Sequence, residues 1–206
     1  APPDERYMEQ MWTGTTSVEA ADKEGWVVSI TPSGGWIPSC IAGRTGMGMS
    51  QRAQSFVLAP VLNPFNVVEP GKRPRVTLTP TIALKDGKPF ISFAVQGGDT
   101  QDQNLLQFFL NMVEFGMTVQ EAVEAPNFNT NQIFLSLGGD DRKPKPGSIV
   151  VDENTPAFTR KELARMGYKL SFDDRTSGPI NAIFFDWKHG SFWGGSSNNG
   201  EDYGIG

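Results

Sequence analysis

The chain has 206 residues and a formal net charge of −5, so it is long enough for one well-filled core and has no basic surface for a nucleic-acid backbone. Its single cysteine, Cys40, excludes an internal disulfide and a cysteine-based metal site, and its single histidine, His189, excludes most zinc chemistry. Every apolar run is too short to span a membrane, and we expect neither a metal nor a cofactor.

Residues 1 to 14 are polar and charged, and we interpret them as a linker in front of one domain of residues 15 to 206. The chain starts Ala-Pro-Pro-Asp-Glu-Arg, with no initiator Met, basic region or apolar segment. We therefore expect no signal peptide here, and a start that is a cut made inside a longer protein.

Three hairpins are predicted from pairs of strand-like segments that flank short turns containing Gly. In chain order the segments are Ser17–Ala21 with Trp26–Ile30, Thr81–Leu84 with Phe90–Val95, and Ala182–Trp187 with Ser191–Trp193. The turns between them are residues 22–25, 85–88 and 189–190.

A long helix is predicted after Thr100, because Thr100 to Gln103 fits a capping box and Gly116 follows Phe115 as a stop. Apolar residues cover most of its circumference, so we expect it to be buried on more than one side.

Two shorter helices are predicted further along the chain. Residues 118 to 121 form a second capping box, and the helix that it opens must end before Pro126. Thr155 as a cap, with Pro156 at the first helical position, opens another helix that continues through Arg165 to Gly167.

These elements favour a fold with both helices and strands, in the broad α/β class and of the α+β type, with two antiparallel sheets sandwiched between helical layers. Residues 32 to 80 are irregular, rich in Gly and Pro, and long for a connection. Such segments are usually functional loops.

Gly14-Thr15-Thr16 is the first candidate for chemistry. A threonine hydroxyl is a poor nucleophile without a base beside it, and an N-terminal threonine has its own α-amino group for that purpose. A preceding Gly suits self-cleavage, because it allows the strained geometry in which Oγ reaches the preceding carbonyl. The alternative is that two threonines simply begin a strand.

The second candidate is Gln96 to Thr100, at the junction of a predicted strand and helix. Gly97 and Gly98 would let backbone N–H groups point at a ligand beside a helix N-terminus, which suits an oxyanion hole. A tight strand-to-helix turn is the simpler alternative.

Three further features are weaker. Lys72 and Arg73 could hold an anionic substrate, although surface solvation is the commoner role of such a pair. The segment from Gly48 to Phe56 is polar within an apolar frame, as in a loop that lines a pocket. His189 lies in a predicted turn, and we expect it to be solvated and without a role.

In this order, the motifs resemble the small subunit of the γ-glutamyltransferase family. The resemblance covers Thr15 to the C-terminus and is specific as an ordered set. The matching pieces are Thr15-Thr16, Asp22 to Gly25, Pro70 to Pro74, Thr79 to Ile82, Lys85 to Lys88, Gly97-Gly98, Phe115 to Met117 and Glu121 to Pro126.

The resemblance implies an N-terminal-nucleophile hydrolase with a four-layer αββα sandwich. The precursor would cleave itself before Thr15, and residues 1 to 14 would be the tail of the large subunit that stays associated as partner. Thr15 would be the nucleophile, Gly97 and Gly98 the oxyanion hole, and Ser33 a hydroxyl that hydrogen-bonds the nucleophile and assists maturation. The substrate would be a small-molecule amide, and the family resemblance suggests a periplasmic or extracellular location.

The positions that would read the substrate depart from the family pattern. The family usually has an asparagine near Gly35, an acidic stretch near residues 50 to 56, and two serines near Val76 and Thr77. Here that stretch contains Arg52 and Ser55 but no carboxylate. Because a γ-glutamyl α-ammonium needs an acidic partner, we expect weak activity on simple γ-glutamyl compounds.

Two alternatives therefore stay open beside a γ-glutamyltransferase. One is an acylase or amidohydrolase of the family whose acyl group is anionic and attracted by Arg52. The other is a member of the family that no longer catalyses and serves as a binding scaffold. As written, with Thr15 inside the chain, its nitrogen is an amide and cannot act as base, so the 206-residue chain alone should be inactive.

Overall fold

The computed structural model describes residues 15–34, 40–133, 144–198 and 204. The predicted linker, residues 1 to 14, and Gly35 lie outside the described residues. The strands are β1 (Val18–Ala21), β2 (Val27–Ile30), β3 (Thr81–Lys85), β4 (Lys88–Val95), β5 (Phe128–Thr130), β6 (Ser148–Asp152), β7 (Lys169–Asp173), β8 (Ile180–Asp186) and β9 (Ser191–Ser196). The helices are α2 (Gln101–Val113), α3 (Val119–Glu124) and α4 (Ala157–Arg165), with 3₁₀ turns η2 (Arg52–Ser55) and η3 (Gly98–Thr100).

All three predicted hairpins are confirmed: β1 pairs with β2, β3 with β4, and β8 with β9, each antiparallel. The second and third hairpins join through β4 and β8 into one sheet of order β3-β4-β8-β9. The two antiparallel sheets that were predicted for the sandwich are therefore confirmed, and a third sheet was not predicted. A further sheet, β5-β6-β7, contains a parallel pair, because α4 connects β6 to β7 and returns the chain to the same edge.

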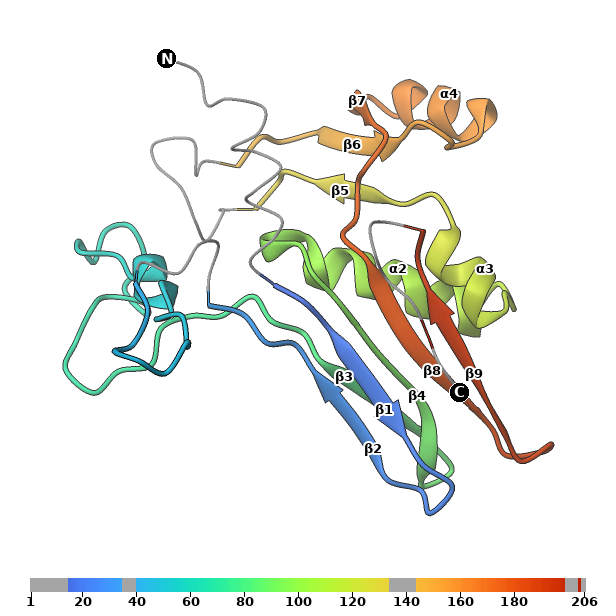
Figure 1. Cartoon of the computed structure of the whole chain (residues 1–206). Coiled ribbons are helices and arrows are strands. Elements are labelled where there is room, and N and C mark those ends of the chain that lie inside the picture. Colours follow the sequence, from blue (N-terminus) through green and yellow to red (C-terminus); the bar gives the residue numbers. More distant parts are fainter. Residues whose placement is uncertain (1–14, 35–39, 134–143, 199–203, 205–206) are drawn as a thin grey trace.

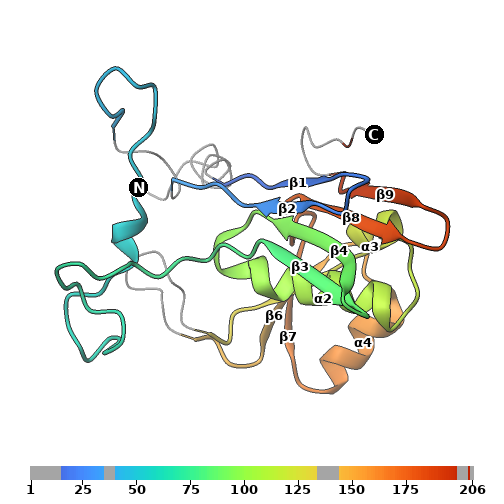
Figure 2. The same cartoon turned by 90° about the horizontal axis from the view of Figure 1, so that it is seen from below.

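The sheets and helices stack in layers (Figure 2). The β1-β2 hairpin lies on one face of the four-stranded sheet, and α2 and α3 cover the opposite face, while the β5-β6-β7 sheet and α4 extend to the side (Figures 1 and 2). The core lies between the four-stranded sheet and the helices, where the Phe93 ring packs against Phe108 and Phe109. No helix among the described residues is both long and apolar enough to cross a membrane.

The β1-β2 hairpin carries polar side chains toward the sandwich. Its register pairs Glu19 with Ser29, and the isolated bridge between Thr15 and Ser33 continues the same register. This face is the more buried one along both strands, whereas the opposite face is apolar and exposed. The exposed residues on that opposite face are Val18, Val28 and Ile30.

The prediction that α2 is buried on more than one side is wrong for the described residues. Leu105 and Phe108 are buried against the sheet, but Leu106, Val113 and the following Phe115 are exposed. One face of the helix therefore packs on the sheet, and the other face is apolar without a covering element among the described residues.

The predicted helix caps have different outcomes. The capping box at Thr118 forms as predicted: the Thr118 hydroxyl accepts from the Glu121 N–H, and the Glu121 carboxylate accepts from the Thr118 N–H. The box predicted at Thr100 does not form, because η3 precedes α2 there and Thr100 is helical and bonds backward to Gly97. The third helix has its expected length, but Pro156, not Thr155, is the residue in the cap position.

Candidate active site

Thr15 lies at the entrance to β1, where the hairpin register brings it opposite Ser33. Its side-chain Oγ1 is 2.9 Å from the Ser33 Oγ, and Thr15 is buried. A backbone bond from the Thr16 N–H to the Pro32 carbonyl, at 3.2 Å, holds the two segments together beside this pair. The two hydroxyl residues expected to work together, 18 positions apart, are thus in contact.

Arg52 extends this contact by one more hydrogen bond. Its Nη2 donates to the Ser33 Oγ at 2.9 Å, and its Nη1 donates to the Thr77 Oγ1 at 3.4 Å. The guanidinium is buried, and burial lowers the pKa of Arg52 from its ordinary value. A positive charge therefore lies two hydrogen bonds from the Thr15 hydroxyl, and Arg52 contacts both Ser33 and Thr77, a residue predicted to bind the substrate.

The η2 turn holds Arg52 in place through Ser55. The Ser55 hydroxyl contacts the carbonyls of Arg52 and Arg75, at 2.9 Å each, and the Asn66 amide donates to the Ser55 carbonyl. Ser55 was predicted to touch the substrate, but it is buried and its hydroxyl is used to fasten the loop. Val76, in contrast, is exposed with no polar group to offer.

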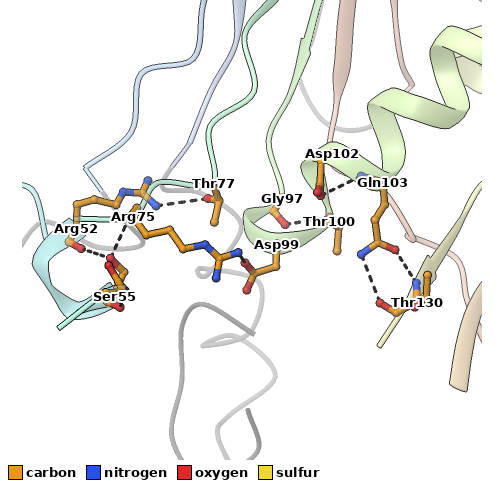
Figure 3. Close-up of polar contacts among 11 residues, drawn as sticks. Arg52, Ser55, Arg75, Thr77, Gly97, Asp99, Thr100, Asp102, Gln103 and Thr130 are labelled. Carbon is orange, nitrogen blue, oxygen red and sulfur yellow. Dashed lines mark hydrogen bonds and ion pairs between the residues drawn. The ribbon is translucent and has the colours of Figure 1, made fainter. Parts of the chain in front are cut away.

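An ion pair that the sequence did not indicate joins this loop to the glycine turn. The Arg75 Nη2 lies 3.4 Å from the Asp99 Oδ1, as Figure 3 shows. The sequence had indicated Lys72 and Arg73 as the basic residues of this segment. Lys72 pairs with Glu69 instead, and Arg73 is exposed.

Gly97 and Gly98 form the turn between β4 and α2 with backbone angles that favour glycine, φ of 143° and 58°. The Gly97 carbonyl accepts two hydrogen bonds from Thr100, one from its N–H at 3.2 Å and one from its hydroxyl at 2.9 Å. Gly98 is buried, yet its N–H donates no hydrogen bond to any described residue. Buried N–H groups without an acceptor are rare, so this donor is available for an anionic oxygen.

The backbone at Gly178 packs closely against Gln96, the residue just before this turn. A Cβ built on Gly178 would lie 2.1 Å from the carbonyl oxygen of Gln96. Only a glycine therefore fits at position 178. The segment before β8 was not expected to have a role, and it carries no sequence signal other than the Ser-Gly-Pro tripeptide itself.

Thr15 and the glycine turn occur at the same end of the sandwich. The chain enters β1 on the side where β4 ends and α2 begins, in both views (Figures 1 and 2). Figure 3 shows that Arg52, Arg75, Gly97 and Thr100 follow one another along this end. His189 lies in the exposed β8-β9 turn, where its ring bonds to Asp186, and this exposure agrees with the solvation expected of it.

The geometry provides a threonine hydroxyl, a serine hydroxyl bonded to it, a buried cation, and an N–H donor with no acceptor among the described residues. These are the parts that acyl transfer needs, except for a base, which an α-amino group on Thr15 would supply after cleavage. No group of three or more His, Cys, Asp or Glu residues in the described part of the chain could hold a metal ion.

Comparison with known proteins gives matches along nearly the whole chain. The family model of gamma-glutamyltranspeptidase matches residues 3–205. The chain is similar to the glutathione hydrolase proenzyme of Bacillus subtilis (strain 168), with 31% identity over 200 residues, which cover 93% of this chain and 31% of the relative. It is also similar to the acylase ACY 1 proenzyme of Pseudomonas sp. (strain SE83), with 29% identity over 84% of this chain and 28% of the relative. The chain thus spans about a third of the length of the curated relatives it matches.

A solved structure of an acivicin-inhibited gamma-glutamyltranspeptidase has the same fold. It matches with a TM-score of 0.75 and 26% identity, and the match covers 91% of this chain and 100% of that chain. The predicted α+β fold of the N-terminal-nucleophile hydrolase type is confirmed by this likeness. The β1-β2 hairpin, the four-stranded sheet and the α2/α3 layer account for three of the four predicted layers within the described residues.

Proposed function

This chain belongs to the gamma-glutamyltranspeptidase family, and from that premise we propose that it is the part of an N-terminal-nucleophile enzyme that carries the catalytic threonine, Thr15. The proposed activity is amide hydrolysis or acyl transfer of the glutathione-hydrolase type. The observation that carries the proposal is the hydrogen bond between the buried Thr15 and the half-buried Ser33, at the end of the sandwich where the glycine turn lies.

The first proposed step is maturation between Gly14 and Thr15. The Thr15 Oγ attacks the Gly14 carbonyl carbon, and the C–N bond breaks as the nitrogen takes a proton. Water then hydrolyses the resulting ester, which leaves a carboxylate on Gly14 and a free α-amine on Thr15. Ser33 supports this step because its hydroxyl contacts the attacking oxygen.

The second proposed step is acyl transfer by the mature enzyme. The α-amine of Thr15 has an ordinary pKa of about 8, so a substantial fraction is neutral near neutral pH and accepts the hydroxyl proton. The Thr15 Oγ attacks the substrate amide, and the Gly98 N–H faces the developing oxyanion. The amine product leaves with the proton, and water or another amine then releases the acyl group from Thr15.

The proposed partner is the other chain of the same precursor. The match covers all of one solved chain of a gamma-glutamyltranspeptidase but only 31% of a curated proenzyme, which fits a chain cut from a longer precursor. The exposed apolar residues on the outer face of the hairpin, Val18, Val28 and Ile30, fit a covered position in such a two-chain enzyme.

Expression of the full precursor tests this function. The unaltered protein should separate into two chains, with Thr15 as a new N-terminus by sequencing and intact mass, and should release nitroaniline from a γ-glutamyl or related nitroanilide. Thr15→Ala should stay whole and inactive, and Thr15→Ser should keep part of both properties because it retains a hydroxyl. Cleavage of the Thr15→Ala precursor at the same bond would refute the nucleophile, and an uncleaved, inactive parent would favour a binding scaffold.

An acylase for anionic acyl groups is a second candidate, and Arg52 is the observation that favours it. The loop that should hold the substrate ammonium contributes a buried guanidinium and no carboxylate. Beside it, Val76 offers no donor, while Thr77 already bonds to Arg52. Such surroundings repel an ammonium and attract a carboxylate.

Two substrates separate the candidates cleanly. Glutaryl anilide and γ-glutamyl anilide have the same chain length and carboxylate and differ only in the α-ammonium group. A higher kcat/KM for the glutaryl compound on the mature enzyme would support the acylase, and a clear preference for the γ-glutamyl compound would exclude it.

A further inference from the structure

We propose that Thr100 and Asn104 are positioning residues that orient the Gly97–Gly98 peptide group as the oxyanion donor. This inference rests on the proposed function of Thr15. Neither residue belongs to the motifs that identified the family, and the sequence had assigned Thr100 only to a helix cap. Their contacts with the glycine turn indicate a different task.

The planarity of the peptide bond links the two ends of this group. The Gly97 C=O and the Gly98 N–H belong to one trans peptide, so they point in opposite directions. The two bonds from Thr100 draw the carbonyl toward the first turn of α2. The Gly98 N–H must therefore point away from the helix, where no described residue accepts it.

Thr100 holds the carbonyl by its side chain as well as by its backbone. The hydroxyl bond, at 2.9 Å, is shorter than the backbone bond, at 3.2 Å, and only a residue with a side-chain donor can add it (Figure 3). Without the hydroxyl, the carbonyl keeps only the bond from the Thr100 N–H, and the peptide plane can rotate more widely because glycines have a wide choice of backbone angles. A rotated plane would turn the N–H away from the oxyanion.

Asn104 orients the hydroxyl itself. Its Nδ2 donates to the Thr100 Oγ1 at 3.2 Å, which occupies a lone pair and leaves the hydroxyl proton for the Gly97 carbonyl. Asn104 is almost fully buried, and its Oδ1 has no hydrogen-bond partner among the described residues. An amide that is half unsatisfied in the core does not stabilise the fold well, and the orientation of Thr100 is a task that accounts for an asparagine at this position.

Steady-state kinetics of the mature two-chain enzyme test the proposal. Thr100→Val keeps the shape but removes the hydroxyl, and we expect kcat to fall roughly ten-fold with KM little changed, less than the loss of a whole oxyanion donor. Thr100→Ser should restore most of kcat. Affinity for a substrate-like boronic acid, which forms a tetrahedral adduct on the threonine, should fall in parallel with kcat.

Asn104→Leu keeps the proposal testable if Thr100→Val does not mature. It removes the orphan acceptor from the core, so it should leave thermal stability close to that of the parent and still lower kcat severalfold. Thr118→Val is the matched control, because it deletes a threonine hydroxyl that caps α3 away from the turn, and kcat should not change.

The outcomes separate this inference from the proposed function. Unchanged kcat and unchanged boronic acid affinity in both Thr100→Val and Asn104→Leu, with an acyl-enzyme still found on Thr15, would overturn the positioning role alone. Activity that survives Thr15→Ala would overturn the proposed function. A fall in kcat that Thr100→Ser does not restore would also count against the role of the hydroxyl.

Discussion

Replacement of Glu19 by glutamine should change how stability depends on pH. Glu19 lies on β1 and faces the interior of the sandwich, where its Oε1 accepts a hydrogen bond from the Ser29 hydroxyl at 2.8 Å. Its other oxygen is buried without a partner among the described residues, and Ser92 on β4 has an equally unpartnered hydroxyl. Burial raises the pKa of Glu19 to about 7, and the hydroxyls of Ser29 and Ser92, which both lie against the carboxyl group, only partly offset this rise.

The sign and size of the effect follow from this pKa. Below pH 4.5 the folded and unfolded chains both hold the proton, so nothing is lost. Between pH 4.5 and 7 the unfolded chain ionises while the folded chain keeps the proton, and the free energy of unfolding falls as the pH rises. At about 1.4 kcal/mol per pH unit the loss is at most about 3 kcal/mol, and we expect about 2 kcal/mol because water reaches part of the side chain.

Urea unfolding of the full protein at a series of pH values measures this loss. Glu19→Gln cannot ionise, so its unfolding free energy should not show this fall. From pH 4.5 to above 7, the parent should therefore lose about 2 kcal/mol of stability relative to the variant. Glu24→Gln, an exposed residue in the turn of the same hairpin, is the control and should follow the parent. Parallel curves for the parent and Glu19→Gln would refute the reasoning.

Two further predictions concern the ends of β4 and the η2 loop. Gly178→Ala should destabilise the protein by about 1–3 kcal/mol and lower kcat, because the added Cβ would collide with the Gln96 carbonyl beside the glycine turn. Gly194→Ala is the control: its Cβ enters open space, so thermal unfolding and activity should not change. Arg52→Gln removes the charge that would attract the substrate carboxylate, so KM for glutaryl anilide should rise about ten-fold or more. KM for an uncharged acyl anilide should change much less. Equal changes for both substrates would show that Arg52 acts only on the fold.

The local elements could be predicted from the sequence because their signals are local. Glycine turns between alternating segments gave the three hairpins, and the Thr118 box gave the start of α3. The Thr100 box failed because the same four-residue pattern also fits a threonine that bonds backward to a carbonyl. Which of the two forms depends on the Gly97–Gly98 conformation, and no rule of capping contains that information.

The parallel pair of β6 and β7 was missed for a related reason. Each strand has its own apolar alternation, but the direction of pairing depends on the connection, and α4 was predicted without a partner sheet. A strand, a nine-residue helix and a second strand in succession are a crossover unit that brings two strands parallel.

In the candidate site, too, the residues that belong to local motifs could be predicted, and the contacts between distant residues could not. Thr15, Ser33 and the glycine pair were expected from motifs, and the structure brings Thr15 and Ser33 into contact. The bond from Arg52 to Ser33 and the pair between Arg75 and Asp99 join residues 19 and 24 positions apart through an irregular loop. Since that loop has no periodicity, no pattern in the sequence fixes which of its side chains turn toward the nucleophile.

The β1-β2 hairpin shows what alternation can and cannot tell. Alternation of polar and apolar residues correctly predicts two faces, and the usual expectation is that the polar face meets water. Here the face that carries Thr15, Glu19, Ser29 and Ser33 is the one that meets the second sheet. A polar face turned inward costs stability unless its groups find partners, and the hydrogen bonds from Thr15 to Ser33 and from Ser29 to Glu19 give that face such partners. Which face of the hairpin meets the four-stranded sheet is decided by these contacts and by packing on β3, β4 and β8, and neither is contained in the alternation.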